Sequence, residues 1–200
     1  MESARRAPKT YVLVATAVMS TISIILDVLP LPRAVWGMKI DLVGTVWVLS
    51  FFLYGLKSAL GVASMTTVYI AMFSSTGYVG AIMKFIATIP MFLVPALVSY
   101  LPFFSNRSSK IFNKPLLIVG LCVLANAVRL LVTTTVNYYW AIPLWTGIPT
   151  EKILATMFND SMLAFIVFIA GMNVFQGIVD IIVPWALAFQ LKLSRYFGTW

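Results

Sequence analysis

The chain has 200 residues, of which 61% are hydrophobic and only 10% are charged, and its mean hydropathy is +0.97. This composition lies far outside the range of soluble domains and predicts an integral membrane protein. The formal net charge of +8 comes from basic residues scattered over short connecting segments. Nucleic-acid binding requires a basic folded surface, so we expect no nucleic-acid partner. The chain has no histidine, the commonest metal ligand, so we expect no metal site.

Six apolar stretches come close to the roughly 20 residues that a bilayer crossing requires. We therefore predict an all-α membrane protein with six transmembrane helices in a single membrane domain over residues 1–200. The third stretch is short, which indicates tilt, a locally thinned bilayer or a broken helix beside a cavity. In chain order the predicted helices cover residues 10–29, 39–56, 58–73, 78–104, 115–137 and 162–193.

The distribution of lysine and arginine predicts the orientation in the cell membrane. If both termini are cytoplasmic, nine basic residues fall in inner segments and three, Arg33, Lys39 and Lys152, fall in outer ones. Cytoplasmic loops carry the excess of basic residues, so we expect both termini in the cytoplasm. The first apolar run continues to Leu29 without a small-residue cleavage site, so we expect a transmembrane helix there and not a signal peptide.

Two cations, Lys84 and Arg129, stand inside predicted helices. An ionised side chain at membrane depth costs about 3 kcal/mol or more, so it usually faces a partner or a wet cavity. Lys84 is barely two turns from the outer surface, so its amine reaching the headgroups is an alternative interpretation. Arg129 is too deep in the membrane for its guanidinium to reach the headgroups. On this map Asp180 is the only carboxylate inside the membrane.

Polar residues recur at helical spacing in the last two predicted helices. At 1.5 Å per residue, most of them fall in the outer half of the membrane together with Lys84. We predict an outward-facing ligand pocket between these helices. Interhelical hydrogen bonding is the alternative for any single Asn or Thr, but it requires neither an Arg nor a Lys. The polar positions are Asn126, Arg129, Thr133 and Asn137 in the fifth helix, and Asn173, Gln176 and Asp180 in the sixth.

Aromatic residues gather where the pocket mouth is expected. Tyr138, Tyr139 and Trp140 form an unbroken run beside Asn137, and Trp145 follows closely. Aromatic residues at this depth usually anchor a protein in the membrane interface. The alternative is that their flat faces stack on a planar ligand.

The sequence contains no motif that supplies catalysis. It has no glycine-rich ATP loop, no serine nucleophile elbow and no paired-carboxylate metal motif. We expect no catalytic residues and therefore no enzyme. Uphill transport would need energy from a partner, or proton coupling through Asp180.

Four stretches resemble the S component of an energy-coupling factor (ECF) transporter, most closely the riboflavin-binding type. The most specific is the stretch beginning at Asn137, which is similar to the family signature Asn-Tyr-Phe-x-x-x-Pro-Leu-Tyr. The resemblance extends over all six predicted helices in order. The four stretches are residues 38–41, 80–84, 137–145 and 173–177.

The resemblance implies that Asn137 and Asn173 hydrogen-bond the vitamin. The lysine of the family's Asn-x-x-Lys motif is Gln176 here, so the family's charge is missing from that position. Arg129 on the neighbouring helix is a candidate to replace that charge. The other expected substrate-binding residues are Lys84, Tyr138 and Asp41.

The resemblance also implies partners: a transmembrane coupling protein and two ATPase subunits, with riboflavin as the transported ligand and no cofactor. The family's first helix presents Ala-x-x-x-Ala to the coupling protein. Here the matching pairs are Thr16 with Ser20 and Ala17 with Thr21, whose small side chains permit close packing. Three alternatives remain open: an S component for another vitamin, a stand-alone proton-coupled carrier, and a membrane enzyme with an unfamiliar site.

Overall fold

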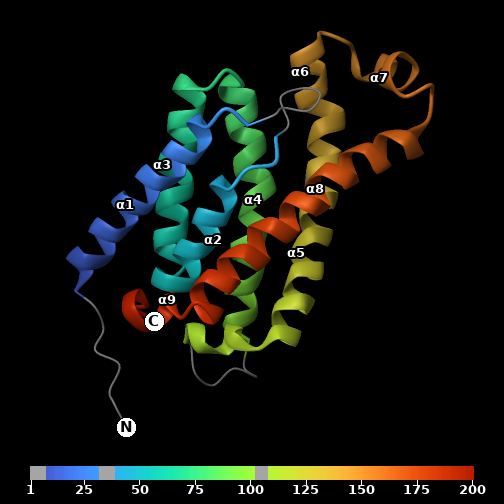
Figure 1. The fold of residues 1–200 in the computed structure, drawn as a ribbon. Coiled ribbons are helices and arrows are strands. Elements are labelled where there is room, and N and C mark those ends of the chain that lie inside the picture. Colours follow the sequence, from blue (N-terminus) through green and yellow to red (C-terminus); the bar gives the residue numbers. More distant parts are fainter. Residues whose placement is uncertain (1–7, 32–38, 102–107) are drawn as a thin grey trace.

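The computed structural model describes residues 8–31, 39–101 and 108–200, and the regular elements within these ranges are helices (Figure 1). Within these ranges, five helical segments are long and apolar enough to cross a membrane. The all-α prediction is thereby confirmed, whereas the count of six crossings and the orientation stay predictions. The five segments are Lys9–Val28 (α1), Leu56–Phe73 (α3), Gly77–Ser99 (α4), Pro115–Thr146 (which begins with α5) and Met162–Gln190 (which begins with α8).

The second predicted helix is shorter than expected. α2 covers Val43–Tyr54, only 12 residues, or about 18 Å at 1.5 Å per residue against a hydrocarbon core of about 30 Å. Most of its residues are buried, so neighbouring helices surround it. The predicted start at residue 39 was wrong because the backbone N–H and C=O of Asp41 are hydrogen-bonded to the side chain of Gln176 and not to a helical turn.

Two further boundaries follow local chemistry. Gly55 lies between α2 and α3 at φ 89°, a conformation that glycine adopts readily, close to the break predicted between residues 56 and 58. α4 ends at Ser99 and not at residue 104 as predicted. Tyr100 and Leu101 make tighter i→i−3 backbone bonds, and Pro102, next in the sequence, disfavours helical geometry in the residue before it.

The fifth and sixth predicted helices do not end as regular helices. α5 (Pro115–Val136) continues through a π-helical turn at Asn137–Ala141 into α6 (Ile142–Thr146). α8 (Met162–Trp185) continues through a second π-turn at Ala186–Gln190. Such turns occur frequently at functional sites, and the first one begins at the predicted ligand residue Asn137.

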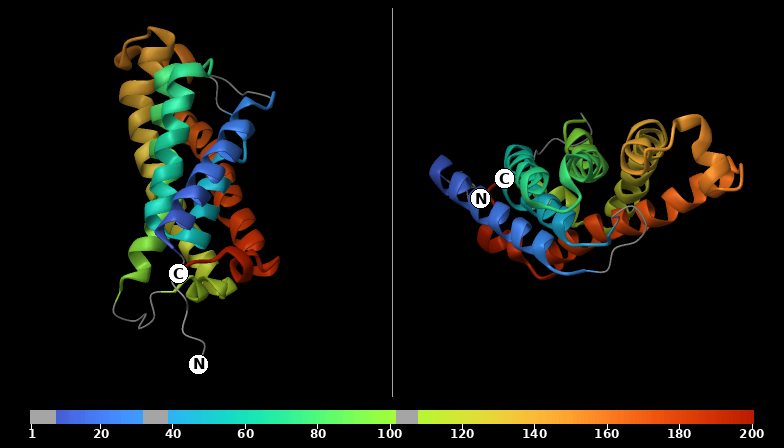
Figure 2. Two further views of the ribbon diagram at one scale, coloured as in Figure 1. Left: turned by 90° about the vertical axis from the view of Figure 1, so that its left-hand side faces the viewer. Right: turned by 90° about the horizontal axis from the view of Figure 1, so that it is seen from above.

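Three short helices complete the described structure, and none of them was predicted. A 3₁₀ helix, Ser109–Asn113, follows α4, while α7 (Thr150–Met157) connects α6 to α8. α9 (Leu193–Phe197) lies near the C-terminus. Seen from above, α7 and the first part of α8 project to one side of the bundle (Figure 2).

The bundle has two distinct ends. The terminal end holds the start of α1 and the last residue of the chain, and the pocket end holds the α3–α4 turn and α6 (Figure 1). α3 packs on α4, α4 on α5, and α5 on α8, while α2 contacts α1, α3, α4 and α8. α2 therefore forms the centre of the bundle.

Aromatic rings fill the terminal end. Neighbouring ring centroids lie 5.2–5.6 Å apart, within the range in which aromatic pairs attract one another. The indole N–H of Trp200 donates to the Phe51 carbonyl, 3.0 Å away, and thereby fastens the end of the chain to α2. The cluster comprises Phe51, Phe52, Phe112, Phe189 and Trp200.

Candidate ligand pocket

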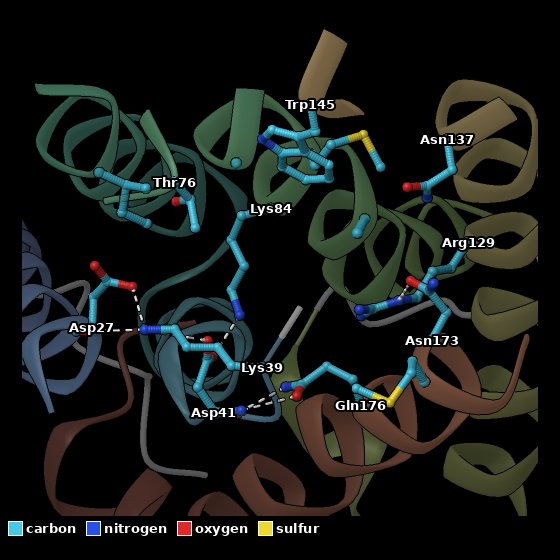
Figure 3. Close-up of a pocket in the computed structure, with 15 residues that line it drawn as sticks. Asp27, Lys39, Asp41, Thr76, Lys84, Arg129, Asn137, Trp145, Asn173 and Gln176 are labelled. Atoms are coloured by element: carbon cyan, nitrogen blue, oxygen red, sulfur yellow. Dashed lines mark hydrogen bonds and ion pairs between the residues drawn. The ribbon is translucent and has the colours of Figure 1, made fainter. Parts of the chain in front are cut away.

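A cavity lies at the pocket end, lined by side chains from α1, the segment before α2, α3, α4, α5, α6 and α8 (Figure 3). Its volume of about 120 Å³ is roughly ten times the 10–15 Å³ that one water molecule needs. The cavity is therefore large enough for an organic ligand or a substantial part of one.

The structure brings together six of the seven residues expected to bind substrate. They come from four separate parts of the chain, and their role as ligand contacts stays a prediction. Lining this cavity are Asp41, Lys84, Arg129, Asn137, Asn173 and Gln176.

Tyr138 is the expected residue that does not line this cavity. Its ring packs 5.4 Å from Phe165 and belongs to a separate apolar cluster beneath α7. Tyr139 is exposed, while Trp140 packs against the apolar cluster formed by Val79, Met83 and Ala141. Trp145, one turn further on, does line the cavity and is therefore the flat side chain of this segment that a ligand would meet.

Two charged residues of the pocket were not predicted to bind substrate, Asp27 in α1 and Lys39 before α2. The Lys39 amine donates to the Asp27 carboxylate at 2.7 Å and to the Asp27 backbone carbonyl at 2.8 Å. The sequence-based map counted Asp180 as the only carboxylate within the membrane, whereas Asp27 lies inside the candidate crossing Lys9–Val28 and lines the cavity together with Asp41. Opposite charges at the ends of two consecutive apolar stretches were the available signal.

Lys84 points into the pocket and forms an ion pair with Asp41. Asp41 is almost completely buried, and its Oδ1 also accepts from the Val43 backbone N–H at 2.9 Å, at the first turn of α2. The Lys84 amine is thus directed at a buried carboxylate inside the bundle.

Arg129 is held between two side chains of α8. Its Nε donates to Asn173 Oδ1 at 3.2 Å, and its Nη1 donates to Asp180 Oδ2 at 2.9 Å. Arg129 is only 4% exposed and Asp180 is completely buried. An unpaired ion at this depth would be costly, so the pair fixes the guanidinium in place.

Gln176 ties α8 to the segment before α2. Its Nε2 donates to the Asp41 carbonyl and to Asp180 Oδ1, both at 2.8 Å, and its Oε1 accepts from the Asp41 N–H at 3.0 Å. Both amide hydrogens therefore have partners within the protein. This residue shapes the pocket wall, and a ligand would have to displace a protein contact to use its donors.

The two asparagines expected to bind the vitamin each donate to their own helix. Asn137 Nδ2 donates to the Thr133 carbonyl at 2.7 Å, and Asn173 Nδ2 donates to the Ile169 carbonyl at 2.9 Å. Asn173 Oδ1 accepts from Arg129. Within the residues that the structure describes, Asn137 Oδ1 accepts no hydrogen bond from the protein, and Asn137 borders the cavity (Figure 3).

The four expected docking residues of α1 face two different ways. Thr16 and Ser20 face α3: the Thr16 hydroxyl lies 2.7 Å from the Ser58 hydroxyl, and the Ser20 hydroxyl donates to Met65 Sδ. Ala17 and Thr21 are exposed. Only the Ala17–Thr21 pair is therefore available to a second protein.

Two comparisons with known proteins indicate a family and a fold. A family model described as ECF transporter, substrate-specific component, matches residues 12–188. A solved structure described as the S component of a bacterial ECF transporter aligns with a TM-score of 0.67 and 21% sequence identity, over 92% of this chain and 97% of that one. At this identity the likeness shows a shared fold. No curated protein matches the sequence significantly.

Proposed function

The chain belongs to the family of ECF transporter substrate-specific components, and from that premise we propose that it captures riboflavin for an ECF-type vitamin importer. Family membership makes it a multi-pass membrane transport subunit and not an enzyme. The observation that carries the proposal is the convergence of Asn137, Asn173 and Arg129 on one cavity, with Trp145 beside them.

The chemistry of this cavity suits a flat, hydrogen-bonding ligand. The pyrimidine edge of a flavin alternates carbonyl acceptors with an N–H donor. Asn137 Oδ1 can accept that N–H, the Arg129 guanidinium can donate to a carbonyl, and the Trp145 ring offers a flat apolar face. Ligand pockets are typically built in this way, from apolar walls with a few placed polar groups.

Gln176 favours a second candidate, an S component for another vitamin. It stands where the riboflavin-type family has lysine, and both of its amide hydrogens already have partners in the protein. A ligand that this lysine recognises in the relatives would lose that contact here. The stand-alone carrier is less well supported, because Asp180, its candidate proton carrier, is ion-paired with Arg129.

We propose six crossings, with α2 as the short one, both termini in the cytoplasm and the pocket facing outward. The excess of basic residues supports this orientation, as does the position of the start of α1 and the end of the chain at one end of the bundle (Figure 1). Cysteines introduced at Lys110 and Thr150 would test it, in a background where Cys122 is replaced by alanine. An impermeant reagent added outside should label Thr150→Cys alone, and labelling of Lys110→Cys alone would invert the map.

We further propose that α1 docks onto a transmembrane coupling protein, which two ATPase subunits drive. The exposed Ala17–Thr21 pair supports this, because small residues let two helices approach closely. No nucleotide-binding loop occurs in the chain, so ATP hydrolysis falls to the partners. Reconstituted protein that accumulated riboflavin against a gradient without those partners would contradict the proposal.

The direct experiment is spectroscopic. We expect protein purified in detergent from cells to carry a bound flavin, visible as a yellow colour with quenched fluorescence. Protein stripped of its ligand should bind added riboflavin, and Asn137→Ala should bind it more weakly than Asn113→Ala, the same substitution at an exposed asparagine of the terminal end. Failure of the stripped wild-type protein to bind riboflavin would overturn the assignment.

A further inference from the structure

The charges around the cavity balance. Three cations line it, Lys39, Lys84 and Arg129. Lys39 pairs with Asp27 at 2.7 Å, Lys84 with Asp41, and Arg129 with Asp180 at 2.9 Å. With each cation matched to one carboxylate, the described part of the pocket carries no net charge.

Asp180 contributes to this charge balance although it does not line the cavity itself. It is fully buried, whereas Arg129 lines the cavity. Both of its carboxylate oxygens are engaged, Oδ2 by Arg129 Nη1 and Oδ1 by Gln176 Nε2.

α2 packs directly against this carboxylate. A methyl group added at Gly44, in the first turn of α2, would stand 2.5 Å from Asp180 Oδ1, which is closer than real contacts allow. The positive end of the α2 dipole therefore adds to the stabilisation of the ionised carboxylate.

An arginine in a pocket ordinarily favours ligands with a carboxylate or phosphate group, which its planar guanidinium binds through two hydrogen bonds. Here one edge of the guanidinium of Arg129 is already bound to an internal carboxylate. A ligand anion would therefore meet a neutralised arginine, and the two lysines of the cavity, Lys39 and Lys84, are likewise each paired with a carboxylate.

We propose that Asp180 determines the charge selectivity of the pocket: by neutralising Arg129 it restricts the site to electrically neutral ligands and disfavours their phosphorylated or carboxylate counterparts. This inference rests on the proposed function only in taking the cavity as the ligand site. Asp180 is a positioning residue, since it acts through Arg129 and does not touch the cavity.

The test compares matched neutral and anionic ligands in four proteins: the wild type, Asp180→Asn, Arg129→Gln and the double variant. The probes are riboflavin with riboflavin 5′-phosphate, nicotinamide with nicotinate, and pyridoxine with pyridoxine 5′-phosphate. We expect the wild type to bind the neutral member of the pair that it recognises at least about tenfold more tightly, which is about 1.4 kcal/mol.

Changing the charge balance should move that ratio in opposite directions. Asp180→Asn leaves Arg129 uncompensated and should lower the preference for the neutral ligand about tenfold, whereas Arg129→Gln should raise it. The double variant is neutral again and should return towards the wild-type ratio. Lys152→Gln, which removes an exposed charge in α7, is the control and should leave the ratio unchanged. If Asp180→Asn does not fold, the other two variants still decide the question.

Failure of this inference is distinguishable from failure of the riboflavin assignment. If riboflavin does not bind but nicotinamide or pyridoxine does, with the expected ratios, the assignment fails and the charge selectivity stands. Equal ratios in the wild type and the charge variants, or a wild type that prefers the anionic ligand, would overturn the selectivity. Binding of none of the six compounds would overturn both.

Discussion

The two ends of the helix bundle share α2 but differ in their chemistry. At the terminal end, Phe51 and Phe52 of α2 pack against the rings of Phe112 and Trp200. At the pocket end, the first turn of the same helix lies against Asp180. Close aromatic packing contributes net stability, whereas buried ion pairs roughly break even against their desolvation. We therefore expect the terminal end to contribute most of the stability and the pocket end to determine ligand specificity.

Replacing Phe52 by alanine should have the largest effect on stability. Phe52 is completely buried among three other rings of the terminal end, and removing a buried phenylalanine typically costs roughly 3–5 kcal/mol. Thermal unfolding in detergent should show a large fall in the midpoint temperature, while the protein that stays folded should bind ligand normally. The matched control is Leu116→Ala, at an 86% exposed position. A similar loss in both variants would argue against a stabilising aromatic core.

The next largest effect should come from the pocket end, on affinity and not on stability. A buried polar contact contributes about 1–3 kcal/mol, so Asn137→Ala and Asn173→Ala should each weaken riboflavin binding roughly five- to a hundred-fold. Titration in detergent measures this, and the unfolding midpoints should change little by comparison with Phe52→Ala. Unchanged titrations for both variants would remove this cavity as the ligand site.

Removing a buried polar contact outside the cavity should affect stability and not ligand binding. The Trp47 indole N–H donates to the Ser23 hydroxyl at 2.9 Å between α2 and α1, and both residues are buried. Ser23→Ala leaves this donor without its partner and should cost roughly 0.6–2 kcal/mol, the range for hydrogen bonds between membrane helices. Unfolding should register this loss and ligand titration should not. The control is Thr21→Val, at an exposed hydroxyl of the same helix.

Features that depend on helical period could be predicted from the sequence. The spacing of Arg129, Asn137, Asn173 and Gln176 places them on single helix faces, and the structure indeed directs them into one cavity. Lys84 was identified for a different reason, the cost of a charge at membrane depth. The carboxylate that pairs with it, Asp41, was known only through the family resemblance.

Features that depend on contacts between distant segments could not be predicted. α2 starts four residues late because Gln176, 135 positions away in the sequence, binds the backbone of Asp41. The ion pair between Arg129 and Asp180 needs a particular rotation of α5 against α8, which spacing alone does not specify. α7 was missed because it has only eight residues and a mixed composition, well short of a membrane crossing.

The smallest effect on the isolated protein should come from the exposed side of α1, which runs from the terminal end to the pocket end. Ala17 is exposed and Ser20 is buried against α3. Ala17→Trp should leave both the unfolding midpoint and riboflavin affinity unchanged but abolish uptake in cells that contain the coupling subunits, because a bulky side chain separates closely packed helices. Ser20→Trp should instead destabilise the protein itself, since overpacking a filled interface typically costs about 1–3 kcal/mol. Normal uptake by Ala17→Trp would show that this face of α1 does not dock, and lost binding would show that it contributes to the pocket.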